Sequence, residues 1–138
     1  MDFLDTNLIV YANDGRDSAK QDRALAVMEQ AFRDESGVIS VQVLQEYAHT
    51  ALNKLNQSRP VVLRQLALLE RLEVVEPDAA MVRRAVELTA LHAISFWDAS
   101  IVAAAERAGC QRLLSEDLNP GQAYGSVRVV NPLAEASG

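Results

Sequence analysis

The chain alternates short apolar runs with longer segments in which apolar residues recur every three or four positions. Short runs such as Phe3-Leu4, Val38-Ile39 and Val74-Val75 are typical of strands buried on both faces of a sheet. Residues 18–34 carry apolar side chains at helical spacing and are soon followed by Gly37. This segment therefore predicts an amphipathic helix.

Further helices are predicted where a capping or helix-opening residue precedes a periodic apolar segment. The predicted starts are Ser40, Pro60, Asp78 and Ser95, and the helix opened by Pro60 is expected to extend to Leu72. Leu113-Leu114 and, after a turn-rich stretch, Val127–Val130 predict a fourth and a fifth strand. Strands separated by helices indicate an α/β fold with a mostly parallel sheet flanked by helices.

Composition favours one globular domain over residues 1–138, with 49% hydrophobic and 23% charged residues. The single cysteine excludes an internal disulfide and favours a reducing compartment. The first residues lack the basic and apolar pattern of a signal peptide, and the longest apolar run, 101–105, is too short to cross a membrane. We therefore expect a cytoplasmic protein without a membrane span.

The net charge is −6, and the isoelectric point is near 4.8. An acidic protein of this kind does not bind nucleic acid passively, because phosphate contacts need Lys and Arg. If the substrate is anionic, bound divalent cations or a local arginine patch must hold it. The densest candidates for such a patch are Arg83, Arg84, Arg64 and Arg71.

Four acidic residues are predicted to meet at one edge of the sheet. Asp5 follows the first strand, Glu46 lies in the second turn of the helix after the second strand, and Asp98 lies in the first turn of its helix. Asp117 comes three residues after Leu114, the end of the fourth strand. Ligands of open parallel sheets bind beyond the carboxyl ends of the strands. This convergence predicts an acidic site.

Asp98 gives the sharpest single signal. It shares a helix face with Ile101, Val102 and Ala105, where an ionised carboxylate is costly unless it is paired or bound to a metal. The structural alternative is a capping box that starts at Ser95.

The other three acids also have structural alternatives. Asp5 fits a helix N-cap, Glu46 fits a solvated helix flank, and Asp117 fits a turn. Glu116 is the rival of Asp117, although neighbouring side chains in an extended segment point to opposite sides. Ser115 and Asp117, two positions apart, would face the same side.

Clustered carboxylates need a counter-charge, and hard divalent cations such as Mg²⁺ or Mn²⁺ suit a site made of oxygen ligands. Such ions activate water and stabilise a phosphodiester under attack. Zinc is disfavoured, because Cys110, His49 and His92 are widely separated. We expect both histidines at the surface. The residues expected in the core are Cys110, Trp97, Met28 and Met81.

At these acids the sequence resembles the PIN-domain ribonucleases, in particular the VapC-like toxins of bacterial toxin–antitoxin pairs. The matching segments follow the family order over almost the whole chain. They are Phe3-Leu4-Asp5-Thr6-Asn7, Ser40 to Glu46, Ser95-Phe96-Trp97-Asp98-Ala99, Leu113 to Leu118 and Val130-Asn131-Pro132.

The resemblance implies a three-layer α/β sandwich and an Mg²⁺- or Mn²⁺-dependent endoribonuclease. Its catalytic and metal-binding residues would be Asp5, Glu46, Asp98 and Asp117, with support from Ser115, Thr6 and Asn7. The resemblance also implies RNA as substrate and a cognate antitoxin that inserts a basic segment into the acidic site. A homodimer is implied as well, with exposed apolar residues between Ser18 and Leu72 as candidates for the contact.

Two other interpretations account for part of this pattern. A phosphatase or receiver domain also has an Asp after its first strand, but it uses a lysine late in the chain, and the only lysines here are Lys20 and Lys54. A catalytically inactive PIN-like module that receives a basic partner peptide stays open as an alternative.

Overall fold

The computed structural model describes residues 1–134 and builds them around one sheet of six strands in the order β3-β2-β1-β4-β6-β5. The strands are β1 (Asp2–Leu4), β2 (Gly37–Ser40), β3 (Glu73–Val75), β4 (Arg112–Leu114), β5 (Ala123–Tyr124) and β6 (Val127–Val130). All neighbouring strands run parallel except β5, which pairs with β6 in the antiparallel direction.

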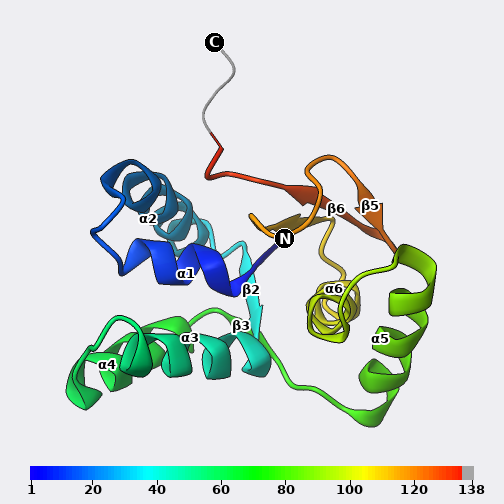
Figure 1. Cartoon of the computed structure of the whole chain (residues 1–138), viewed down its shortest axis with the longest axis horizontal. Helices are drawn as coiled ribbons and strands as arrows, with labels where there is room; N and C mark the ends of the chain where they lie inside the picture. The colour runs from blue at the N-terminus through cyan, green and yellow to red at the C-terminus, as the bar shows by residue number, and fades with distance from the viewer. Residues whose placement is uncertain (135–138) are drawn as a thin grey trace.

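Helices cover both faces of the sheet. They are α1 (Thr6–Ala12), α2 (Ser18–Arg33), α3 (Val41–Asn53), α4 (Arg59–Leu69), α5 (Ala79–His92) and α6 (Phe96–Arg107). In Figure 1, α1 to α4 gather on the left and α5 and α6 on the right, with the sheet between them. The predicted sandwich of a mostly parallel sheet between helices is confirmed.

The predicted helix caps are also confirmed, because their side chains accept hydrogen bonds from the first turn. Asp5, Ser40, Asp78 and Ser95 each stand at an N-cap and accept from a backbone N–H. Each of these helices therefore begins where a short polar side chain satisfies an otherwise unpaired amide.

One helix boundary and one strand differ from the prediction. Helix α4 ends at Leu69 rather than Leu72, since the chain must turn at residues 70–72 to enter β3, and buried Leu72 packs over Gly37 in that turn. Strand β5 was missed, so the segment 127–130 is the sixth strand. With only two residues, β5 is too short to show an alternating pattern.

The core contains Cys110, Met28 and Met81 as predicted, but the prediction for Trp97 is wrong, because its side chain is 65% exposed. Trp97 shares the helix face of buried Ile101 but lies in the first turn of α6. Helical side chains lean toward the N-terminus of their helix. A residue in the first turn therefore extends beyond the packed layer.

Within the described part of the chain, no single helix is long and apolar enough to cross a membrane, although α5 and α6 pass the same test as a pair bent by 116°.

Candidate active site

Asp5 lies where β1 ends and α1 begins, and the surrounding backbone holds it there. Its amide donates to the carbonyl of Leu114 at the end of β4 (3.0 Å). One carboxylate oxygen accepts from the amide of Thr6 (2.7 Å), and the other accepts from the hydroxyl of Ser115 (2.7 Å). The N-cap role and a fixed orientation at the carboxyl edge of the sheet therefore occur together.

The carboxyl group of Asp5 is buried without a compensating positive charge. Asp5 is only 5% exposed. Burial raises the pKa of its carboxyl group to about 7, and the negative charges of Asp117 and Glu46 add to this rise. The hydrogen bonds from Ser115 and Thr6 oppose this rise. The protonated form of this carboxyl group is therefore favoured far more than it is in an ordinary aspartate.

Glu46 is tied to the same place through Thr6. The Thr6 hydroxyl donates to Glu46 Oε1 (2.9 Å), and the Gln42 amide approaches the same oxygen (3.5 Å). The side chain is half-buried rather than fully solvated. Helix α3 thus directs an acid toward the end of β1.

Asp98 reaches the site from α6 on the other side of the sheet. Its amide donates to the hydroxyl of Ser95 (3.0 Å), so the cap predicted as an alternative does exist. The residue is half-buried, and not fully inward as its helix face suggested. Burial raises its pKa, the charge of Asp117 adds to this, and hydrogen bonding to Ser95 opposes it.

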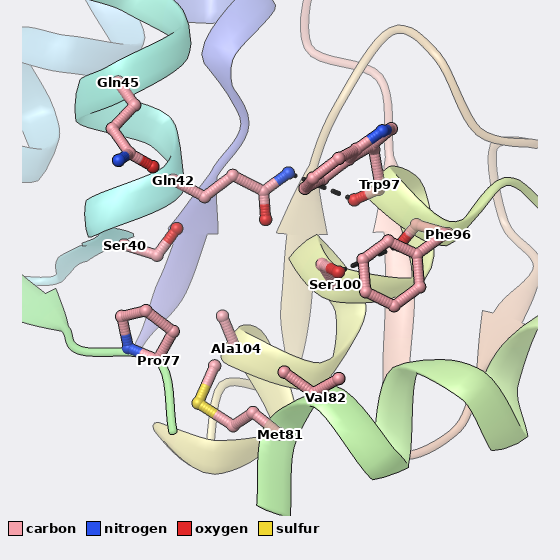
Figure 2. Close-up of a pocket in the computed structure, with 10 residues that line it drawn as sticks. All are labelled: Ser40, Gln42, Gln45, Pro77, Met81, Val82, Phe96, Trp97, Ser100 and Ala104. Carbon is pink, nitrogen blue, oxygen red and sulfur yellow. Dashed lines mark hydrogen bonds between the residues drawn. The ribbon is translucent and has the colours of Figure 1, made fainter. Parts of the chain in front are cut away.

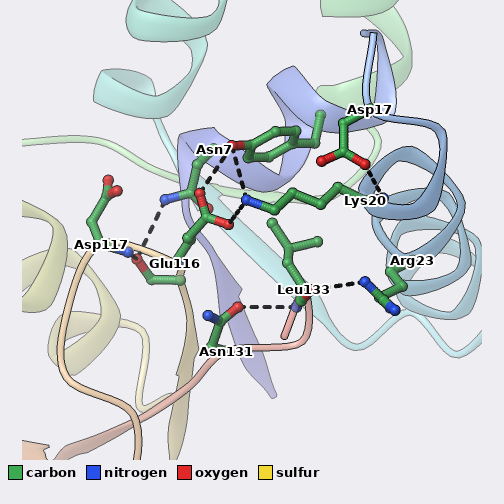
Figure 3. Close-up of polar contacts among 10 residues, drawn as sticks. Asn7, Asp17, Lys20, Arg23, Glu116, Asp117, Asn131 and Leu133 are labelled. Carbon is green, nitrogen blue, oxygen red and sulfur yellow. Dashed lines mark hydrogen bonds and ion pairs between the residues drawn. The ribbon is translucent and has the colours of Figure 1, made fainter. Parts of the chain in front are cut away.

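The loop after β4 separates the roles of its two acids (Figure 3). Glu116 pairs with Lys20 (2.7 Å) and accepts from the hydroxyl of Tyr11 (3.0 Å). Asp117 is exposed, and its charge acts on Asp5 and Asp98 alike. Glu116 is therefore neutralised, whereas Asp117 belongs electrostatically with the other acids.

Ser115 organises this loop from a fully buried position. Its oxygen accepts from the amide of Asp117 (3.1 Å) and is approached by the side-chain amide of Asn7 (3.5 Å). The Asn7 oxygen in turn accepts from the Glu116 amide (3.4 Å). Of the expected support residues, Ser115 and Asn7 thus join the ends of β1 and β4, whereas Thr6 joins the end of β1 to Glu46 on α3.

Asp5, Glu46 and Asp98 differ from the other acids that are at least partly buried in residues 1–134, because they have no cationic partner, whereas Asp117 is exposed. Across residues 1–134, seven other carboxylates form ion pairs with Arg or Lys, but none of Asp5, Glu46, Asp98 and Asp117 does. Within the same residues, no three Asp, Glu, His or Cys side chains stand ready to hold a metal ion. The oxygens of Asp5 accept one hydrogen bond each, which leaves lone pairs for a cation. The donor set therefore fits a hard cation in its chemistry, although side chains must move to surround one.

One of the four arginines expected to hold an anionic substrate is already paired with acidic residues. Arg84 forms ion pairs with Glu106 (2.9 Å) and Glu87 (3.1 Å), so it is not available as free charge. Arg83, Arg64 and Arg71 remain exposed. Lys20 binds Glu116 of the acidic loop, a contact that the sequence did not predict because the two residues lie 96 positions apart.

Comparison with known proteins identifies the architecture. A family model of the PIN domain matches residues 3–124. A search of curated proteins finds no match.

Several solved structures share the fold at low sequence identity. A toxin–antitoxin complex from Klebsiella pneumoniae aligns with a TM-score of 0.71 and 21% identity over 96% of this chain and 98% of that one. A sarcin–ricin-loop-cleaving VapC toxin of Mycobacterium tuberculosis gives 0.64 and 22% over 85% and 92%. A VapBC complex from Rickettsia felis bound to promoter DNA gives 0.67 and 21% over 93% and 96%.

Proposed function

The chain belongs to the PIN-domain family, and from this premise we propose that it is a metal-dependent endoribonuclease, the toxin of a toxin–antitoxin pair. The observation that carries the proposal is the acidic group at the carboxyl edge of the sheet, in which Asp5, Glu46 and Asp98 are at least partly buried without a cationic partner. Burying such charges is costly unless a ligand compensates for them. A cationic ligand would supply this compensation.

The residues that would hold Mg²⁺ or Mn²⁺ are Asp5, Glu46, Asp98 and Asp117. When bound, the ion activates a water molecule and offsets the charge that develops on the phosphodiester. Ser115 and Thr6 keep the Asp5 carboxylate oriented. Because the pKa of Asp5 lies near 7 without a cation, cation binding would release a proton from it.

RNA is the proposed substrate, and the cytoplasm is the proposed location of the enzyme. The similarity in fold to a VapC toxin that cleaves the sarcin–ricin loop supports the choice of RNA. An antitoxin is the proposed partner, because several similar structures are toxin–antitoxin complexes. A basic antitoxin segment would replace the cation with charge-assisted hydrogen bonds to the same acids.

We also propose that residues 1–138 act as one nuclease domain that forms a homodimer. Exposed apolar side chains on α2, α3 and α4 are the candidates for the contact, namely Leu25, Leu52, Leu63 and Leu68. Covering apolar side chains on a helical surface with a second copy removes them from water and so stabilises the dimer.

The alternative is an inactive binding module, favoured by the absence of a ready-made three-ligand group within residues 1–134. The test combines RNA cleavage with calorimetric titration of Mg²⁺ and Mn²⁺. We expect cleavage that EDTA abolishes and that Asp98→Asn reduces severely, because the substitution removes charge from the site without changing its shape. Glu29→Gln, on the exposed face of α2, is the matched control.

Full activity of a rigorously purified Asp98→Asn protein would refute the assignment of the site. Absence of both cleavage and cation binding in the wild type would instead favour the binding module.

A further inference from the structure

Trp97 is the only tryptophan of the chain, and it immediately precedes Asp98. Its side chain is 65% exposed, and its ring packs edge-on against Phe96 with 5.2 Å between the ring centroids. The amide of Gln42 donates to the backbone carbonyl of Trp97 (3.2 Å), which ties the start of α6 to α3 (Figure 2). The backbone of Trp97 is therefore tied to α3, while its indole contacts Phe96 and stays largely exposed.

A small cavity of about 160 Å³ opens next to this ring, between α3, α5 and α6. Its floor is apolar and includes Met81, Val82 and Ala104, whereas Gln42 and Gln45 supply amide groups at its rim. Pockets for drug-sized ligands measure roughly 300–1,000 Å³, so this cavity fits a single ring. None of the residues that line it is charged, which suits a neutral group better than a phosphate or a basic side chain.

A second, more open hollow lies beside this cavity and reaches Glu46, one of the four acids. It is lined by Glu46 together with Gln42, Gln45 and Trp97, and the last three also line the first cavity. Glu46 is linked through Thr6 to the end of β1, where Asp5 lies. A ligand that occupies the cavity beside Trp97 can therefore extend past Gln42 and Gln45 as far as Glu46.

We propose that Trp97 and this cavity bind one unpaired base of the RNA, close to the phosphodiester that the acids cleave. The inference rests on the proposed ribonuclease function and adds a subsite for the base. Proteins recognise single-stranded RNA by stacking splayed bases on aromatic rings and by hydrogen bonds to base edges. The open indole supplies the stacking surface, and the glutamine amides supply donors and acceptors for a base edge.

The test uses the fluorescence of Trp97, which has no other tryptophan to obscure it. In EDTA, so that no cleavage occurs, short single-stranded RNA should quench this fluorescence in a saturable manner. An abasic oligonucleotide of equal length and charge should not. With Mg²⁺ or Mn²⁺ present, Trp97→Ala should raise the KM for RNA roughly 5- to 100-fold with little change in kcat. Trp97→Phe should restore part of the loss, and Leu91→Ala, at 66% exposure, is the matched control.

The outcomes separate this subsite from the ribonuclease proposal. If the wild type cleaves RNA but Trp97→Ala cleaves it with an unchanged KM, the subsite is refuted and the ribonuclease stands. If base-dependent quenching occurs without cleavage under any metal condition, the base site stands and the ribonuclease fails. Equal quenching by the abasic oligonucleotide, or none by RNA, would overturn the base site and leave the cavity to a protein partner.

Discussion

Replacing Asp5 by Asn should stabilise the metal-free protein at alkaline pH and have little effect in mild acid. The side chain is buried, and its pKa is about 7 when folded, against 3.8 for an ordinary aspartate. The folded state therefore binds this proton more tightly than the unfolded state does. Asp5 then contributes stability that grows as the pH falls from about 7 toward 3.8 and is lost as the pH rises through about 7.

The size of the effect follows from the two pKa values. One pKa unit corresponds to about 1.4 kcal/mol, so ionised Asp5 lowers the free energy of unfolding by about 4 kcal/mol relative to its protonated form. Asn removes the charge but replaces the hydrogen bond with Ser115 imperfectly, which costs about 1 kcal/mol. The expected gain is thus about 3 kcal/mol at pH 8 and near zero at pH 5.

The measurement is urea denaturation of wild type and Asp5→Asn in EDTA at several pH values between 5 and 8. Asp22→Asn, at an exposed position on α2, is the control and should change the free energy of unfolding little at any pH. A difference between Asp5→Asn and wild type that does not vary with pH would refute the raised pKa. A clear loss of stability at pH 8 would show that the ionised carboxylate of Asp5 stabilises the fold through its hydrogen bonds with Thr6 and Ser115.

Three further predictions concern the rest of the site. Asp117→Asn should reduce RNA cleavage by roughly 10–100-fold, whereas Glu116→Gln should leave it nearly unchanged because Lys20 already neutralises that acid; the opposite order would move the fourth acid to Glu116. Ser115→Ala should lower the free energy of unfolding by about 1–3 kcal/mol in urea denaturation, since Asp5 and the amide of Asp117 lose their hydrogen bonds with the buried hydroxyl. An unchanged free energy of unfolding would show that Ser115 does not organise the loop. Arg83→Glu should weaken RNA binding and reduce the slope of log affinity against log salt by about one; an unchanged slope would place the phosphate contacts elsewhere.

The order of helices and strands was readable from local patterns, because strands and helices of this fold bury their apolar residues at different periods. The cap residues marked the starts of α1, α3, α5 and α6. The end of α4 and the two-residue strand β5 were not predicted correctly, since both depend on the path of the neighbouring chain.

Local sequence patterns did not predict the contacts of the acidic residues. The pairing of Glu116 with Lys20 and of Arg84 with Glu106 joins distant parts of the chain. Both pairings change which charges are free, and spacing within one helix carries no information about them. Trp97 shows the same limit, because periodicity gave its helix face but not that the first turn extends beyond the packed layer.

The sequence by itself determined the alternation of elements, the caps, and the placement of Asp5 and Asp117 just after parallel strands. These features depend on local backbone preference and on the direction of neighbouring strands. Only the tertiary structure decided the burial of Asp5, its raised pKa and the bridge from Thr6 to Glu46. Burial and electrostatic interaction depend on distances through space, and these are set when the ends of β1 and β4 and the start of α3 pack together.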